Sequence, residues 1–166
     1  MIKTEHILAI EEYDSSEELA QSESWLVNEA RAATQFAYAP YSNFNVGAVA
    51  RLSNGEVVVG SNQENASYPV GICAERVLLS AVASQHPGVG VDTIAVSYNN
   101  LKGKSDLPIS PCGLCRQSLV EFEQRGKKPI RMILSGMEGK VFIIESASQL
   151  LPLAFTADGL KTDKQM

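Results

Sequence analysis

The three cysteines of this chain constrain its fold more than any other feature. One lies in the motif CAER at residues 73–76, and two lie in the motif PCGLCR at residues 111–116. Each motif follows a loop and opens a run with the apolar spacing of a helix. A fold that brings these two predicted helix starts together places three sulfurs around one point. Cys112 and Cys115, at i and i+3, then face the same way on the first helical turn.

These positions favour an open metal site. The N-terminus of a helix carries unpaired N–H groups and the positive end of the helix dipole, which lower a thiol pKa and favour thiolate ligands. Three protein ligands leave the fourth tetrahedral position for water, as in catalytic zinc sites. Glu75, two residues after Cys73, is placed to move the proton of that water. A zinc knuckle without its fourth ligand, or merely buried cysteines, are the alternative interpretations.

The order of predicted elements indicates an α/β domain with one central sheet. Apolar periodicity predicts a first helix with Ser22 or Ser24 as its N-cap. The apolar stripe of this helix continues to Ala37, and Pro40 ends the helix. The turn residues Asn54-Gly55 predict a tight hairpin. Further helices are predicted over 74–85 and 113–124, and strands over 45–52, 56–61, 93–98, 130–135 and 140–144.

Charge separates residues 1–24 from residues 25–166. The first segment holds seven acidic residues and one base, whereas the second holds 12 acids and 13 bases within a whole-chain net charge of −5. We therefore expect an acidic extension, with a short strand at 7–10 and an acidic connector, before a catalytic domain. The balanced body lacks a basic face for nucleic acid. Its one basic cluster, at 125–131, is interpreted as a solvated turn.

Composition excludes several classes of protein. With 45% hydrophobic and 20% charged residues, the chain is not disordered, collagenous or a coiled coil as a whole. Its apolar runs are too short to cross a membrane. No secretory signal is recognisable, so disulfides are not expected and the cytoplasm is the expected location.

Four stretches of the chain resemble cytidine deaminase of the small, zinc-dependent, homotetrameric type. They are AYAPYSNFNVGA at 37–48, GSNQENASYPVGICAER at 60–76, PCGLCRQSLVEF at 111–122 and LLPLAFTADGL at 150–160. The two cysteine-bearing stretches are the most specific of the four, because they combine the metal-ligand spacing with the acidic residue of zinc deaminases. The resemblance implies a three-layer fold, in which a central mixed five-stranded sheet carries helices on both faces.

The resemblance also implies a role for particular residues. Cys73, Cys112 and Cys115 are implied as ligands of one Zn²⁺ per subunit, Glu75 as the proton shuttle, and Arg76 as the partner of the cysteine sulfurs. The residues implied to bind substrate are Phe44, Asn62, Glu64, Ala74 and Phe155. Among these, Asn62 and Glu64 bond the sugar hydroxyls, Phe44 lines the base pocket, and Phe155 reaches the site of a neighbouring subunit.

Three functions fit these observations. The first is hydrolytic deamination of cytidine and deoxycytidine in pyrimidine salvage, by a homotetramer or a dimer. The second is deamination of a related aminopyrimidine nucleoside such as the antibiotic blasticidin S. The third is a non-catalytic module stabilised by zinc. Leu114 and Leu153 depart from the family pattern, where alanine and glycine are common, but neither position is a metal ligand.

Overall fold

The central sheet described here has six strands, one more than the five that the family resemblance implies. A computed structural model describes residues 1–160, and its strand order is β1-β6-β5-β4-β2-β3. All neighbouring strands are antiparallel except β4 and β5, so the sheet is mixed as expected. The strands are β1 Glu11–Tyr13, β2 Phe44–Leu52, β3 Val57–Ser61, β4 Val91–Asn100, β5 Arg131–Ser135 and β6 Val141–Ile144.

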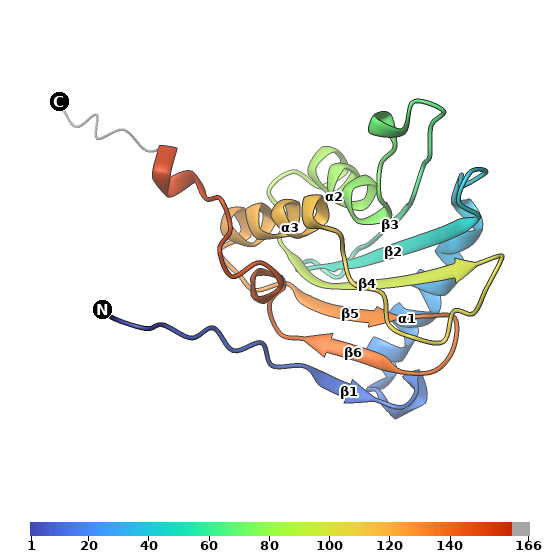
Figure 1. Cartoon of the computed structure of the whole chain (residues 1–166), viewed down its shortest axis with the longest axis horizontal. Helices are drawn as coiled ribbons and strands as arrows, with labels where there is room; N and C mark the ends of the chain where they lie inside the picture. Colours follow the sequence, from blue (N-terminus) through green and yellow to red (C-terminus); the bar gives the residue numbers. More distant parts are fainter. Residues whose placement is uncertain (161–166) are drawn as a thin grey trace.

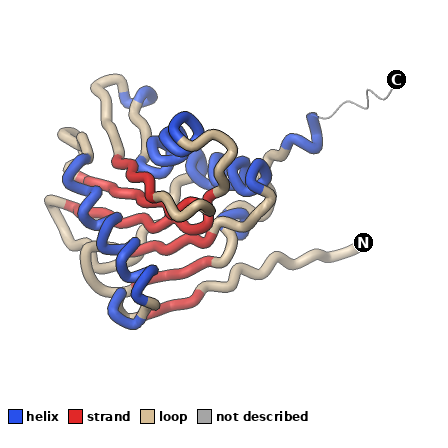
Figure 2. The backbone as a smooth tube through the Cα atoms, turned by 180° about the vertical axis from the view of Figure 1, so that it is seen from behind, coloured by secondary structure: helices blue, strands red, loops and turns tan. Residues whose placement is uncertain are grey.

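Helices cover both faces of the sheet, which confirms the three-layer α/β prediction. Helix α1 (Gln21–Ala33) lies behind the strands in Figure 1 and in front of them in Figure 2. Helices α2 (Ala74–Gln85) and α3 (Gly113–Gly126) lie on the opposite face, beside each other (Figure 1). No helix among residues 1–160 combines the length and apolarity needed to span a membrane.

Two apolar clusters join these layers. Strand residues Val49, Ala95 and Ile133 face α1, which contributes buried Leu26 and Ala30. The strand residues on the opposite face meet α2 and α3 in the larger cluster, whose fully buried members include Leu52, Leu78, Ile94, Leu119, Met132 and Leu134. The alternation of strand side chains between faces therefore gives each helix layer its own core.

The predicted hairpin is confirmed. Gly55 has a φ of +88° and donates its N–H to the carbonyl of Leu52 at 2.9 Å, which closes the turn between β2 and β3. Glycine adopts this backbone conformation without the steric cost that a side chain would bring.

The first helix was predicted with wrong limits. It begins at Gln21 with Ala20 at the N-cap, and it ends at Ala33, so neither Ser22 nor Ser24 caps it and Ala37 lies outside it. The Thr34 hydroxyl donates to the Arg31 carbonyl at 2.7 Å, and the chain tightens into a 3₁₀ turn over Thr34–Phe36. Local hydrogen bonding by a Thr side chain thus competes with continuation of the α-helix.

The acidic extension contains the sixth strand, but not where apolar residues predicted it. Residues 7–10 form no strand, and β1 pairs with β6 instead, with Glu12 opposite Phe142. Charge explains this position, because Lys140 forms an ion pair with Glu12 and lies 3.4 Å from Asp14. Residues 11–13 of the acidic stretch thus form the edge strand of the sheet, where we expected a connector.

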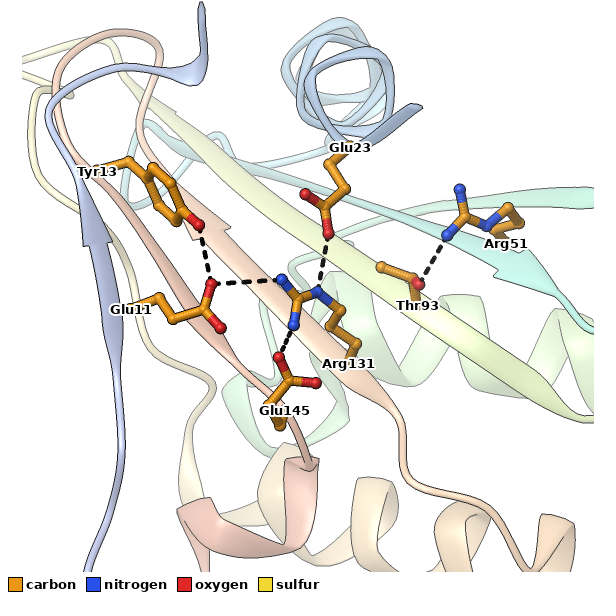
Figure 3. Close-up of polar contacts among 7 residues, drawn as sticks. All are labelled: Glu11, Tyr13, Glu23, Arg51, Thr93, Arg131 and Glu145. Atoms are coloured by element: carbon orange, nitrogen blue, oxygen red, sulfur yellow. Dashed lines mark hydrogen bonds and ion pairs between the residues drawn. The ribbon is translucent and has the colours of Figure 1, made fainter. Parts of the chain in front are cut away.

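Arg131 connects this strand to the body of the domain (Figure 3). Its guanidinium lies 2.8 Å from Glu23 of α1 and 3.4 Å from Glu11 of β1, and it also pairs with Glu145. The Tyr13 hydroxyl donates to Glu11 at 2.9 Å. Arg131 lies within β5, so only part of the basic cluster at 125–131 occupies a turn.

Gly60 of β3 allows α2 to approach the sheet closely. A Cβ atom at this position would lie 2.6 Å from both the Ala74 carbonyl oxygen and the Leu78 nitrogen. We expect Gly60→Ala to push the start of α2 outward and to destabilise the protein by about 1–3 kcal/mol, the usual cost of overpacking. Chemical denaturation measures this change. In the control Gly126→Ala, the nearest atom is 3.9 Å from the added Cβ, so equal losses in the two variants would contradict the explanation.

Candidate metal centre

Two helix N-termini meet at the three cysteines. Cys73 is the N-cap of α2 and Cys112 is the N-cap of α3, and both have extended backbone dihedrals. Neither cysteine forms a side-chain cap hydrogen bond to its helix. The sulfurs are therefore directed toward one another instead of toward the N–H groups of their own helices, as the sequence analysis predicted.

The separations between the sulfurs fit a tetrahedral zinc site. The Sγ of Cys112 lies 3.8 Å from that of Cys73 and 3.5 Å from that of Cys115, and the three Sγ atoms lie within 4.8 Å of one another. With Zn–S bonds of about 2.3 Å, the edge of a tetrahedron is about 3.8 Å. Thiolates are soft ligands that favour zinc over magnesium or calcium. The three cysteines therefore have the donor type and spacing to hold a zinc ion.

Burial differs among the three cysteines. Cys115 is fully buried, Cys73 is partly buried and Cys112 is exposed. The cluster is consequently open on the side of Cys112.

The pKa values of Cys73 and Cys115 are shifted in opposite directions. A hydrogen bond from Cys115 lowers the pKa of Cys73 to about 6, and the charge of Arg76 contributes a smaller lowering. The pKa of Cys115 is raised because its thiol is the donor in that bond and is buried. Cys73 is therefore the first of the pair to become a thiolate. Arg76 acts on Cys73 through its charge, and its bonding to the cysteine sulfurs stays a prediction.

Glu75 lies beside the cysteines on the first turn of α2. The side chain is buried, with 5% of its surface exposed. Burial raises the pKa of Glu75, and this effect exceeds the opposing effects of hydrogen bonds with its own backbone N–H and with Cys115. A carboxyl group with a raised pKa binds a proton more readily than an ordinary carboxyl group does, which suits a general acid–base catalyst.

Asn62 binds the start of β2, and Glu64 binds the loop that leads into it. The amide of Asn62 accepts a hydrogen bond from the Val46 N–H at 2.7 Å and donates one to the Phe44 carbonyl at 2.9 Å. Glu64 accepts hydrogen bonds from the backbone N–H groups of Tyr41 and Ser42 at 2.9 and 3.3 Å. The pKa of Glu64 is lowered, chiefly by a hydrogen bond from the Ser42 side chain. This carboxylate is therefore held ionised and in a fixed position.

A cavity of about 310 Å³ adjoins Glu64. Its lining residues are Tyr41, Ser42, Glu64, Asn65, Tyr68 and Gly71. The rings of Tyr41 and Tyr68 approach each other, with centroids 5.7 Å apart. The cavity combines aromatic walls with one carboxylate, and no lysine or arginine lines it.

The remaining predicted residues occupy different surroundings. Phe44 stacks on Tyr98 with ring centroids 4.7 Å apart, and Ala74 is fully buried at the start of α2. Phe155 is 67% exposed, and its backbone is bonded to Gln117. Sequence reasoning did not identify Tyr98 or Gln117, since neither belongs to the metal-ligand or acidic pattern. The position of Gln117 just after the second cysteine motif was the available signal.

Comparison with known proteins agrees with this geometry. The family model for the cytidine and deoxycytidylate deaminase zinc-binding region matches residues 20–128. This chain belongs to that family. The match begins at the start of α1 and includes all three cysteines and Glu75.

Individual relatives cover most of the chain. The cytidine deaminase of Halalkalibacterium halodurans is 37% identical over 135 residues, which is 81% of this chain and 95% of the relative. The crystal structure of cytidine deaminase from Burkholderia pseudomallei has a TM-score of 0.69 at 40% identity and covers 82% of this chain and 100% of that chain. The crystal structure of cytidine deaminase from Mycobacterium tuberculosis has a TM-score of 0.62 at 33% identity and covers 80% of this chain and 95% of that chain.

Removal of the buried cysteine tests the metal centre. We expect the purified protein to contain zinc and Cys115→Ser to lose it, because a hydroxyl is a poor replacement for a thiolate ligand. Elemental analysis after gel filtration measures the bound metal. Ser118→Ala, one turn further along α3, serves as the control. Equal zinc in Cys115→Ser and the unmodified chain would contradict the assignment of this ligand.

Proposed function

We propose that this protein hydrolyses cytidine and deoxycytidine to uridine and deoxyuridine, with release of ammonia, as a step of pyrimidine salvage. The observation that supports this function best is the buried Glu75 beside three cysteines at two helix N-termini. A non-catalytic zinc module would not need a buried carboxyl group at this point, because burial of such a group without a role is costly.

Cys73, Cys112 and Cys115 would hold one zinc ion per chain. When bound, zinc supplies an activated water at neutral pH, which is the nucleophile of this class of reaction. The formal charge of three thiolates exceeds that of the ion, and the two helix N-termini and Arg76 supply positive potential to offset it.

Glu75 would move the protons of the reaction. Its carboxylate takes one proton from water and gives it to N3 of the pyrimidine as the C4–O bond forms. It then takes the second proton of that water from the oxygen now bonded to C4 and delivers it to the departing amino group. The C4–N bond breaks, so that water and cytidine yield uridine and ammonia. Burial of Glu75 favours these transfers, because it raises the pKa of the carboxyl group and so helps it to take up a proton.

Glu64 and Asn62 would orient the nucleoside. Glu64 keeps Oε1 free of the two backbone hydrogen bonds, which both reach Oε2, so a sugar hydroxyl has an acceptor. The Asn62 side chain donates a hydrogen bond to the backbone carbonyl oxygen of Phe44. Phe44, whose ring stacks on that of Tyr98, would line the base pocket. Ala74 would contact the base with its backbone, and Phe155 would complete the site of a neighbouring subunit.

The proposed assembly is a homotetramer in the cytoplasm, with a dimer as the smaller alternative. Residues 25–166 would form the catalytic domain and residues 1–24 an added acidic segment.

Assays with cytidine, deoxycytidine and blasticidin S in parallel test the proposed substrate class. Turnover of blasticidin S, without turnover of cytidine or deoxycytidine, would show that the substrate is the antibiotic and not the nucleoside.

Replacement of the carboxyl group tests the role of Glu75. We expect Glu75→Gln to keep the fold and bound zinc but to lower kcat by about 10²–10⁴-fold, the usual contribution of a general acid–base group. The amide preserves volume and hydrogen bonding but cannot carry protons between water and substrate. Ultraviolet assay of cytidine, with zinc analysis of the same sample, measures both. A variant that keeps more than about a tenth of the activity would refute the role.

The site should also prefer nucleosides over their 5′-phosphates. Gly60 to Ala74 contains no lysine or arginine, and the carboxylate of Glu64 is held ionised in the cavity wall. A phosphate that enters here would lose hydration without gaining a cationic partner. We expect a preference of up to about 10⁴ in kcat/KM, measured with cytidine and its 5′-monophosphate. Comparable values for the two substrates would overturn this interpretation of Glu64.

A further inference from the structure

We propose that Arg116 is a positioning residue for Cys112, and that it anchors the peptide before this cysteine to the C-terminal segment at 150–155. The inference rests on the proposed zinc site, and it concerns how the chain holds its most exposed ligand.

The start of α3 has little support from side-chain contacts. Cys112, Gly113 and Leu114 are all exposed, with Leu114 at 68%. A Cβ atom at Gly113 would meet no atom within 4 Å, so the space beside this residue is open. Only Cys115 is buried in this turn. The orientation of Cys112 therefore depends on what holds the chain immediately before it.

Arg116 holds that point. Its Nε donates to the Pro111 carbonyl oxygen at 2.8 Å. This oxygen belongs to the peptide plane that ends at the nitrogen and Cα of Cys112, and a peptide plane is nearly rigid. Pro111 is buried, and its ring fixes φ. A hydrogen bond to its carbonyl consequently restricts the direction in which the Cys112 side chain leaves the backbone.

The same guanidinium is attached to a second part of the chain. Its Nη1 donates to the Leu150 carbonyl oxygen at 3.1 Å. Leu150 ends the 3₁₀ turn Ala147–Leu150 and belongs to the larger apolar cluster, with 7% of its surface exposed. The planar guanidinium presents its donors in a fixed arrangement. Arg116 thus links the peptide before the metal ligand to a turn whose last residue, Leu150, is held in the apolar core.

Gln117 secures the next part of the C-terminal segment. Its Nε2 donates to the Phe155 carbonyl at 2.8 Å, and its Oε1 accepts the Phe155 N–H at 3.2 Å. Two successive residues of α3 therefore bind the segment at both of its ends. Loss of either contact loosens the segment, but only Arg116 reaches the peptide of Cys112.

The rate of zinc loss tests this role without reference to catalysis. The zinc-loaded protein is mixed with an excess of a colorimetric chelator, and the transfer of zinc is followed. We expect Arg116→Ala to release zinc about tenfold faster or more, which is the scale of outer-shell effects on metal sites. Arg116→Lys should be intermediate, because one ammonium group cannot hold both carbonyls in a common plane.

Arg125→Ala is the matched control, since it removes the same charge from the same helix. The Arg125 side chain lies over the Phe122 ring, 4.6 Å from its centroid, far along α3 from the cysteines. We expect its zinc release to equal that of the unmodified chain. Release from Arg116→Ala at the control rate would overturn the proposal. If Arg116→Ala fails to fold, the zinc release of Arg116→Lys is compared with that of the control instead, and release at the control rate would overturn the proposal.

Cobalt substitution separates positioning from general destabilisation. The absorption bands of Co²⁺ report its coordination geometry, so they should change in Arg116→Lys and stay unchanged in Arg125→Ala. Unchanged bands in Arg116→Lys would indicate a purely structural role and overturn the proposal. A protein that binds neither zinc nor cobalt would instead overturn the proposed function itself.

A double-mutant cycle tests the contribution of the C-terminal segment. We expect Gln117→Ala to accelerate zinc release in the unmodified chain but to add little in the Arg116→Lys background, because both residues act through one segment. Fully additive effects on the rate would show that the segment does not act through Arg116.

Discussion

The structure depends on one arrangement, the meeting of two helix N-termini on the same face of the sheet. Each helix starts with a cysteine that gives its own helix no side-chain cap, so the sulfurs are available to a shared ligand. The first N–H groups and the dipoles of both helices point to the same region, which favours negative charge there. This arrangement also determines the position of Glu75, because the first turn of α2 places the Glu75 carboxyl group against the cysteines.

The sheet fixes where these helices begin. Gly60 lets the first turn of α2 contact β3 at backbone distance, and the apolar cluster beneath α2 and α3 holds both helices to the strands. Small displacements of either helix would change the separation of the sulfurs directly. The geometry of the metal site therefore depends on residues well beyond its ligands. Gly60 and the apolar residues beneath the helices contribute through their size, because they set where each helix lies.

Sequence patterns predicted the centre of this protein better than its ends. Helix α2 has its predicted limits, and the hairpin at Gly55 and the three cysteines lie as expected, because these features depend on local periodicity, turn chemistry and ligand spacing. The sixth strand was misplaced because Lys140 and Arg131, distant in sequence, determine where the acidic segment pairs. The contacts of Arg116 and Gln117 were missed for a similar reason, since their partners are backbone atoms of the C-terminal segment. Their position directly after the last cysteine was the available signal, but it does not identify those partners.

The short acidic strand β1 has a consequence for the behaviour of the protein at high concentration. An exposed sheet edge offers unpaired backbone groups to any other chain, and natural proteins protect such edges with short strands and charged side chains. Here β1 is three residues long, carries Glu11 and Glu12, and covers the edge of β6. Two copies that approach along this edge would bring carboxylates together. The acidic segment thereby opposes edge-to-edge association and protects the protein against aggregation from this side.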